Sequence, residues 1–194
     1  TWNNFSITPA LNNFNAYATL VSPGLDPVAP VQRVLNGNRA IKLNIGSDDG
    51  TFLGHDVTSM SRLIEINQPF IDINYSVILK NPNHNNGRNP FFVVRLYDTN
   101  GNQIRQFSII SDVNDCIFTP MSNNTILYTD WVCDRLDTSD LVGEEVIIEF
   151  IISDCPPGGH FGTVYIDDIC DTNCANPISG SINLNPIQTL FCPT

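Results

Sequence analysis

The chain has 194 residues, of which 42% are hydrophobic, and a net charge of −11 at pH 7, so it can bury the core of one domain of ordinary size. Its nine basic residues form no run. This argues against binding to nucleic acid or to anionic lipid, because both need clustered Lys and Arg. Charged residues make up only 15% of the chain, against a usual share of about 25%, which is typical of extracellular β proteins.

The apolar runs are short, rich in Val, Ile, Phe and Tyr, and separated by Asn, Gly, Asp and Pro, so they predict strands and no helices. In chain order the expected strands are residues 17–21, 39–45, 61–67, 70–80, 90–97, 103–110, 125–135, 144–152 and 162–169. Nine strands at this spacing predict an all-β fold, a two-sheet antiparallel β-sandwich of the jelly-roll type, over residues 1–170. Residues 171–194 show little periodicity and are expected to be a linker or the start of a following domain.

The lengths of the connections predict where a binding site lies. Successive strands of a jelly roll alternate in direction, so every second connection emerges at the same end. The long connections 46–60, 81–89, 111–124 and 153–161 are therefore expected at one end, and the short turns 68–69, 98–102 and 136–143 at the other. Long loops on a rigid sandwich are common binding sites, and His55, His84 and His160 all fall in them.

Six cysteines without a C-x-x-C pair argue against a thiolate zinc site or a thioredoxin-type site. They are Cys116, Cys133, Cys155, Cys170, Cys174 and Cys192. An even number indicates disulfides formed in an oxidising compartment. With no signal peptide and no apolar run long enough to span a membrane, the chain is expected to be a mature, exported segment cut from a longer protein.

The alternation of strands also suggests which cysteines pair. Cys155 is expected at the long-loop end, where Cys116 lies in a neighbouring connection. Cys170 lies too far along a strand to reach Cys155. Cys133 and Cys170 are at similar depths on strands that run the same way, which leaves Cys174 for Cys192. Other connectivities stay open, because spacing alone does not fix them.

Two acidic residues end the last expected strand. Asp167 and Asp168 point to opposite faces of it, so one of them is available to a structural ion, with Asp26 as a further ligand. Calcium takes six to eight oxygen ligands, and carboxylates, amides and carbonyls are plentiful in this chain. The alternative is a solvated strand end with no ion.

The segment 154–162 predicts a shaped loop, because it contains two prolines and three glycines. It presents His160 and Phe161, and His84 is expected at the same end of the sandwich. Two His and Asp154 are a set that binds a transition metal or a sugar hydroxyl. The alternative is that these histidines hydrogen-bond within their own loops.

Catalysis has little support in the sequence. It contains no G-x-S-x-G elbow, no H-E-x-x-H motif and no P-loop. Only four Glu are present, and none is expected among the long loops. The chain is therefore expected not to be an enzyme.

Several stretches together resemble a known kind of domain. They are residues 20–27, 81–84, 95–102, 154–155 and 158–162 through to 166–167. They are similar to a jelly-roll domain of large surface and secreted proteins of Bacteroidota, many of them adhesins exported by the type IX system of gliding motility. More loosely, the fold resembles carbohydrate-binding modules and MAM-type domains. The resemblance implies extracellular adhesion or ligand display, and it draws attention to His84, Asp154, His160 and Asp167.

Three functions compete on this basis. The first is a non-catalytic adhesion domain, secreted or on the cell surface, whose long loops face a glycan or a protein. The second is a carbohydrate-binding module of a polysaccharide-degrading enzyme, with Trp131 and Phe161 as candidate stacking residues. The third is a structural spacer or filament subunit that contacts its neighbours through its terminal segments. None of the three involves nucleic acid or insertion into a membrane.

Overall fold

The computed structural model describes residues 18–44, 57–82, 84, 88–155 and 159–169. These residues form eleven strands: β1 (Ala18–Val21), β2 (Ala40–Leu43), β3 (Val57–Glu65), β4 (Phe70–Lys80), β5 (Phe91–Asp98), β6 (Gln103–Ile110), β7 (Thr119–Met121), β8 (Ile126–Tyr128), β9 (Val132–Asp137), β10 (Glu145–Ser153) and β11 (Gly162–Asp167). Within the described ranges there is no helix, and so none that is long and apolar enough to cross a membrane.

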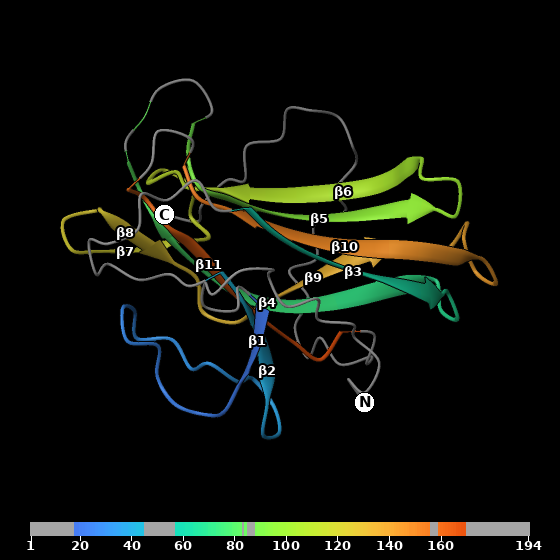
Figure 1. Ribbon diagram of the computed structural model, residues 1–194, viewed down its shortest axis with the longest axis horizontal. Helices are drawn as coiled ribbons and strands as arrows, with labels where there is room; N and C mark the ends of the chain where they lie inside the picture. Colours follow the sequence, from blue (N-terminus) through green and yellow to red (C-terminus); the bar gives the residue numbers. More distant parts are fainter. Residues whose placement is uncertain (1–17, 45–56, 83, 85–87, 156–158, 170–194) are drawn as a thin grey trace, which may run out of the picture.

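The strands form two antiparallel sheets that pack face to face (Figure 1). One sheet has seven strands in the order β1-β2-β11-β4-β8-β7, with β9 also paired to β4. The other has four strands in the order β3-β10-β5-β6. The predicted fold class, a two-sheet antiparallel β-sandwich of the jelly-roll type, is confirmed.

The short turns lie together at one end of the sandwich. The connections β3–β4, β5–β6 and β9–β10 all emerge at the right of Figure 1. In the β5–β6 turn, Asp98 Oδ1 accepts hydrogen bonds from the amides of Asn100 and Asn102 at 2.9 and 2.7 Å. Gly101 adopts φ +86° there, a conformation that glycine takes without steric cost. The Asn-Gly pair thus closes the hairpin that alternation predicts.

The expected strand 125–135 is in fact two strands, β8 and β9. Both pair with β4, but Ile78 faces Tyr128 whereas Tyr75 faces Val132. Three residues of one strand therefore oppose two of the other, which is a β-bulge. The reason is Thr129, whose Oγ1 accepts the hydrogen bond of the Val77 amide at 3.0 Å. A side-chain oxygen takes the place of a ladder carbonyl, and the regular strand ends there.

Strand β7 lies inside the connection 111–124, which the sequence predicted to be a loop. It pairs with β8 from Thr119↔Tyr128 to Met121↔Ile126. The turn between them contains three consecutive non-glycine residues with positive φ, Ser122, Asn123 and Asn124, at 52°, 56° and 65°. Asn is one of the few residues that tolerate this conformation.

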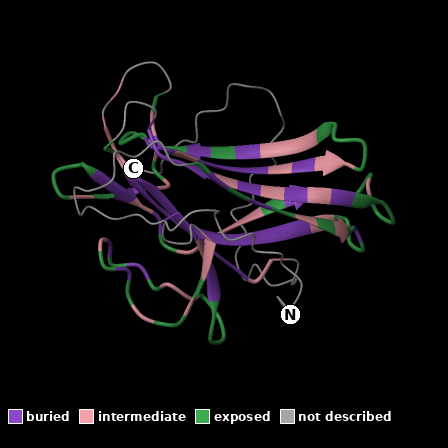
Figure 2. Cartoon of the chain, viewed as in Figure 1, coloured by how far each residue is buried: buried purple, intermediate pink, exposed green. Residues whose placement is uncertain are grey.

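The main core lies between the sheets. Strand β4 runs through the centre of the larger sheet and is buried from Ile71 to Leu79 (Figure 2). Tyr75 packs on the rings of Phe92 and Phe107, with ring centroids 5.2 and 5.8 Å away. Such tilted aromatic pairs add to the stabilisation from apolar burial.

A second, smaller core forms on the outer face of the seven-stranded sheet. The segment 22–39 folds back over this face and buries Ala29 and Val31 against Ile78 and Tyr165. The outer face of the four-stranded sheet is different, since β3 alternates between buried and exposed residues and Leu63 is 51% exposed. Among the described residues, the segment 22–39 therefore covers the outer face of one sheet, and the outer face of the other is left open. The predicted boundary at residue 170 lies outside the described residues and stays a prediction.

Candidate functional site

Two histidines and a cysteine meet at the long-loop end. His84 lies in the β4–β5 connection, and Cys155 and His160 lie in the β10–β11 connection. One potential ligand atom from each of the three lies within 4.8 Å of the others. Cys155 Sγ is 3.0 Å from His160 Nδ1, and the two imidazoles pack edge to face with centroids 5.1 Å apart. We call this group the His-Cys-His cluster.

The backbone around the cluster is held by buried polar contacts. The amide of Cys155 donates to the carbonyl of His160 at 3.0 Å, which closes the loop on itself. Asp154 Oδ1 accepts hydrogen bonds from Asn44 Nδ2 at 2.8 Å and from the amide of Gly162 at 2.9 Å. Asp154 is thus a buried anchor of the loop. Its carboxylate is not in the cluster, contrary to the expectation that it joins the two histidines.

Close packing of the two sheets also constrains this loop. A Cβ on Gly162 would lie 2.9 Å from the carbonyl oxygen of Ser153, closer than real Cβ atoms approach backbone. Ser153 ends β10 of one sheet and Gly162 begins β11 of the other. Glycine at position 162 therefore allows the two strands to approach closely where the chain crosses from one sheet to the other.

The surroundings of His160 favour its uncharged imidazole. Burial, followed by the neighbouring His84 and Lys80, lowers the pKa of His160 below its ordinary value. His84 Nε2 is buried and has no hydrogen-bond partner among the described residues. A buried polar atom without a partner is uncommon and calls for an explanation.

The prediction that His84 and His160 emerge at the same end is confirmed by their contact. The expectation that the loop presents Phe161 is wrong, because Phe161 is 8% exposed and belongs to the second core. It is not available for stacking on a sugar. Trp131 packs against the same core and donates from Nε1 to the carbonyl of Gln32 at 2.8 Å. His55 lies outside the described residues.

The cysteines also differ from the expectation. Cys155 is buried and retains a thiol, so the expected Cys116–Cys155 disulfide is wrong. Its sulfur faces His160 instead. Cys116 and Cys133 are both disulfide-bonded. Cys170, Cys174 and Cys192 lie outside the described residues, so the pairings Cys133–Cys170 and Cys174–Cys192 stay predictions.

The aspartates expected to bind calcium hold the segment 22–39 in place. Asp167 Oδ2 accepts the amides of Leu35 and Asn36 at 3.0 and 3.1 Å. Asp26 Oδ1 accepts the amides of Val28 and Ala29 at 2.7 and 3.0 Å. Burial raises the pKa of Asp167 above its ordinary value, although the amides of Asn36 and Leu35 oppose this shift.

These aspartates do not come together as a cluster of three ligand side chains within the described ranges; the group found there is the His-Cys-His cluster. Asp168 accepts a hydrogen bond from the side chain of Asn36. Calcium binding at Asp26, Asp167 and Asp168 stays a prediction.

Sequence reasoning missed a polar network on the open face of the four-stranded sheet. Tyr97 Oη donates to Glu149 Oε2 at 3.1 Å and accepts from Arg95 Nη1 at 3.3 Å. Arg95 Nε donates to Gln106 Oε1 at 3.1 Å. The four side chains come from the neighbouring strands β10, β5 and β6. We call them the sheet-face network.

Apolar side chains adjoin this network. Leu63, Ile147 and Tyr97 form one row across β3, β10 and β5. The next row contains Glu149, Arg95 and Gln106. The signal for this face was present in the sequence as alternation: Arg95 and Tyr97 are two residues apart, as are Ile147 and Glu149. Which face of which sheet stays open was not readable, because that depends on where the segment 22–39 folds.

The fold defines an all-β sandwich domain. No protein-family model matches the chain, and no curated protein matches it. Similar solved structures are carbohydrate-binding modules with β-sandwich folds.

One is TmCBM61 in complex with β-1,4-galactotriose, with a TM-score of 0.43 and 12% identity, over 79% of this chain and 80% of that one. A second comes from work on promiscuous specificity in modules of the β-sandwich superfamily, with a TM-score of 0.35 and 13% identity over 79% of this chain and 53% of that one. A third is CBM27-1 of Caldicellulosiruptor saccharolyticus in complex with mannohexaose. Its TM-score is 0.35 and its sequence identity is 9%, over 68% of this chain and 73% of that one.

Proposed function

We propose that this chain is a non-catalytic glycan-binding module that holds a neutral sugar chain on the open face of its four-stranded sheet. The observation that carries the proposal is the sheet-face network, Arg95, Tyr97, Gln106 and Glu149. Its members are pre-positioned by cross-strand pairing, so little side-chain entropy is lost when they bind.

The chemistry of the network suits sugar hydroxyls. Arg95 offers several N–H donors, Glu149 offers acceptors, and Tyr97 and Gln106 offer both. These groups are half-buried, so they are partly desolvated yet reachable. The exposed Leu63 and the half-buried Ile147 supply apolar surface for the C–H groups of a sugar ring.

The size of the face also supports an extended ligand. Four strands spaced about 4.8 Å apart span roughly 14 Å. Neighbouring same-face rows along a strand are roughly 7 Å apart. An exposed sheet face of this extent suits a chain of sugars better than a single small molecule, which proteins usually hold in a deep pocket.

The network also argues for binding without hydrolysis. Cleavage of a glycosidic bond ordinarily uses two carboxyl groups that flank it. The sheet-face network contains a single carboxylate, Glu149, and it is engaged by the hydroxyl of Tyr97.

An extracellular setting is part of this proposal. The disulfide-bonded Cys116 and Cys133 support it, because disulfides persist in oxidising compartments. Display within a larger secreted or surface protein, export by the type IX system, and contact with neighbouring domains or a surface protein remain proposals that rest on the sequence resemblance. A spacer role has no specific observation in its favour.

Calorimetric titration with neutral oligosaccharides, including β-1,4-linked galactose and mannose chains, tests the proposal. We expect saturable binding that weakens at least tenfold in Tyr97→Ala and in Glu149→Gln. Glu145→Gln is the matched control, because Glu145 is an exposed carboxylate on the same strand β10; it should bind like the parent. If no sugar binds, or if both network variants bind like the parent, the proposal is wrong. Loss of sugar binding only in variants of His84 or His160 would show that the sugar binds at the long loops instead.

A further inference from the structure

We propose that His84, Cys155 and His160 form a zinc site that ties the β4–β5 connection to the β10–β11 connection. The three ligand atoms lie within 4.8 Å of one another. Two imidazoles and a thiolate are a soft, nitrogen- and sulfur-rich set of the kind zinc prefers. This site is independent of the sheet-face network and of the glycan proposal.

The distances fit a tetrahedral ion after a small adjustment. Zn–N bonds of about 2.0–2.1 Å and Zn–S bonds of about 2.3 Å place tetrahedral ligand atoms roughly 3.3–3.6 Å apart. Cys155 Sγ and His160 Nδ1 are 3.0 Å apart, and the widest separation in the cluster is at most 4.8 Å. Side-chain movements of about 1 Å therefore convert the cluster into a coordination shell.

A second observation points to a ligand. His84 Nε2 is buried and has no hydrogen-bond partner among the described residues, although the His84 ring packs against His160 and one of its nitrogens lies within 4.8 Å of the ligand atoms of Cys155 and His160. Leaving a buried imidazole nitrogen unsatisfied costs free energy. A metal ion would supply the missing partner.

The burial of Cys155 decides against another role for the same residues. A cysteine beside a histidine is also the arrangement of a nucleophilic thiolate. Cys155 is 0% exposed, whereas a reactive thiolate must be reachable by its substrate. His84 and His160 are only half-buried, so an ion and one water as a fourth ligand have access from the side of the histidines.

The site would have a mechanical consequence. β4 and β11 belong to the seven-stranded sheet, and β5 and β10 belong to the four-stranded sheet. A zinc ion held by both connections would link the two sheets at the end opposite the short turns. It would thereby stabilise the folded state by mass action, since the unfolded chain does not hold the three ligands together.

The decisive experiment measures Zn²⁺ and Co²⁺ binding to the full chain with its disulfides intact, after metal has been removed with EDTA. We expect one zinc per chain, and a cobalt complex with the intense charge-transfer absorption of a cobalt–thiolate bond. His84→Ala, His160→Ala and Cys155→Ser should each weaken zinc binding by about 100-fold or more, because even the loss of a group that only orients a ligand costs 10–100-fold.

Asp112→Asn is the control for loose binding to the acidic surface. Asp112 is an exposed carboxylate of the β6–β7 connection outside the cluster, and its replacement should leave zinc affinity unchanged. If a variant fails to fold, the zinc stoichiometry and the cobalt spectrum of the parent protein still decide the test. A cobalt complex without thiolate absorption, or zinc binding that Asp112→Asn weakens as much as Cys155→Ser does, would overturn the proposal.

Discussion

The hydroxyl of Tyr165 donates a 2.6 Å hydrogen bond to Asp26 Oδ2, across 139 positions of the sequence. Tyr165 is fully buried on β11, and Asp26 is 7% exposed in the segment 22–39. Burial, followed by the hydrogen bond and the charge of Asp26, raises the pKa of Tyr165, so the hydroxyl keeps its proton and remains a donor. This bond fastens the segment that covers the seven-stranded sheet.

Tyr165→Phe should destabilise the protein by about 1–3 kcal/mol, because it leaves a buried carboxylate oxygen of Asp26 without its donor. Urea unfolding measures this loss. Tyr128→Phe is the matched control, since the hydroxyl of Tyr128 has no hydrogen bond among the described residues; we expect a change within about 0.5 kcal/mol. Faster amide exchange confined to residues 24–33 would show that the segment loosens first. Equal effects of the two variants would contradict the role given to this bond.

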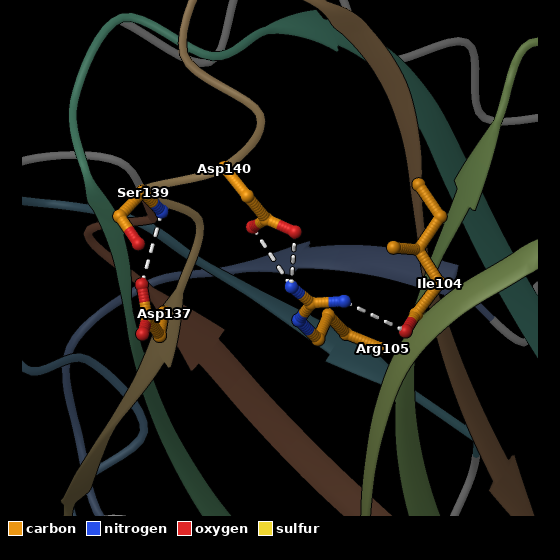
Figure 3. A network of polar contacts seen from close by, with 5 residues as sticks. All are labelled: Ile104, Arg105, Asp137, Ser139 and Asp140. Carbon is orange, nitrogen blue, oxygen red and sulfur yellow. Dashed lines mark hydrogen bonds and ion pairs between the residues drawn. The ribbon is translucent and has the colours of Figure 1, made fainter.

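Two arginine–aspartate pairs predict losses of stability of different size for the same kind of substitution. Arg135 donates to both oxygens of Asp72 at 2.6 and 2.8 Å, and the Asp72 side chain is 1% exposed. Arg105 donates to both oxygens of Asp140 at the short-turn end, where the Asp140 side chain is 58% exposed (Figure 3). Removing a partner strands a buried charge in the first pair but only an exposed charge in the second.

Arg135→Ala should therefore lower the melting temperature several times more than Arg105→Ala. Part of the loss comes from the guanidinium packing 3.9 Å above the centre of the Phe70 ring. Added salt should have little effect on the Arg135 pair and should reduce any contribution of the Arg105 pair. Scanning calorimetry of both variants at low and high salt checks this, and similar losses would refute it.

The hydrogen-bonded pair of the buried Tyr75 and the half-buried Asp134 predicts a pH dependence. Burial raises the pKa of Asp134 above its ordinary value, and the hydrogen bond from Tyr75 only partly opposes this. A carboxyl group with a raised pKa in the folded state binds more protons folded than unfolded, so its contribution to stability is full below the unfolded pKa. That contribution falls as the pH rises through the folded pKa.

Asp134→Asn should remove this effect. The free energy of unfolding of the variant, relative to that of the parent, should increase as the pH is raised from below the ordinary aspartate pKa toward neutrality. Urea unfolding at several pH values measures the difference. A constant or decreasing difference would show that Asp134 does not carry a raised pKa in the folded state.

Removal of metal distinguishes the calcium site predicted from the sequence from the zinc site proposed from the structure. We expect EDTA to lower the melting temperature. Zn²⁺ should restore it if the His-Cys-His cluster holds zinc, and Ca²⁺ should restore it if Asp26, Asp167 and Asp168 hold calcium, because a ligand of the native state stabilises by mass action. Melting curves at matched ionic strength decide this. Recovery with zinc alone would contradict the calcium prediction.

Alternation and turn chemistry were sufficient for most of the fold. Short apolar runs rich in Val, Ile, Phe and Tyr placed nine segments as strands, and the short connection 98–102 placed the β5–β6 turn. The strand 125–135 was split because the hydroxyl of Thr129, in place of a backbone carbonyl of its own strand, accepts the hydrogen bond of the Val77 amide of β4. A threonine within an apolar run does not reveal whether its oxygen will face a neighbouring amide, so this break could not be read from the sequence.

The sequence by itself determined the class of fold, the separation of long loops from short turns at opposite ends, and the presence of His84 and His160 at the same end. These follow from local patterns and from the alternation of strand direction. The tertiary structure decided that Cys155 is the third member of the cluster, that Asp154 anchors the loop, and that Phe161 is buried. It also decided which sheet face stays open. These outcomes depend on side-chain direction within a loop and on the path of the segment 22–39, and both are set by packing between residues that are far apart in the sequence.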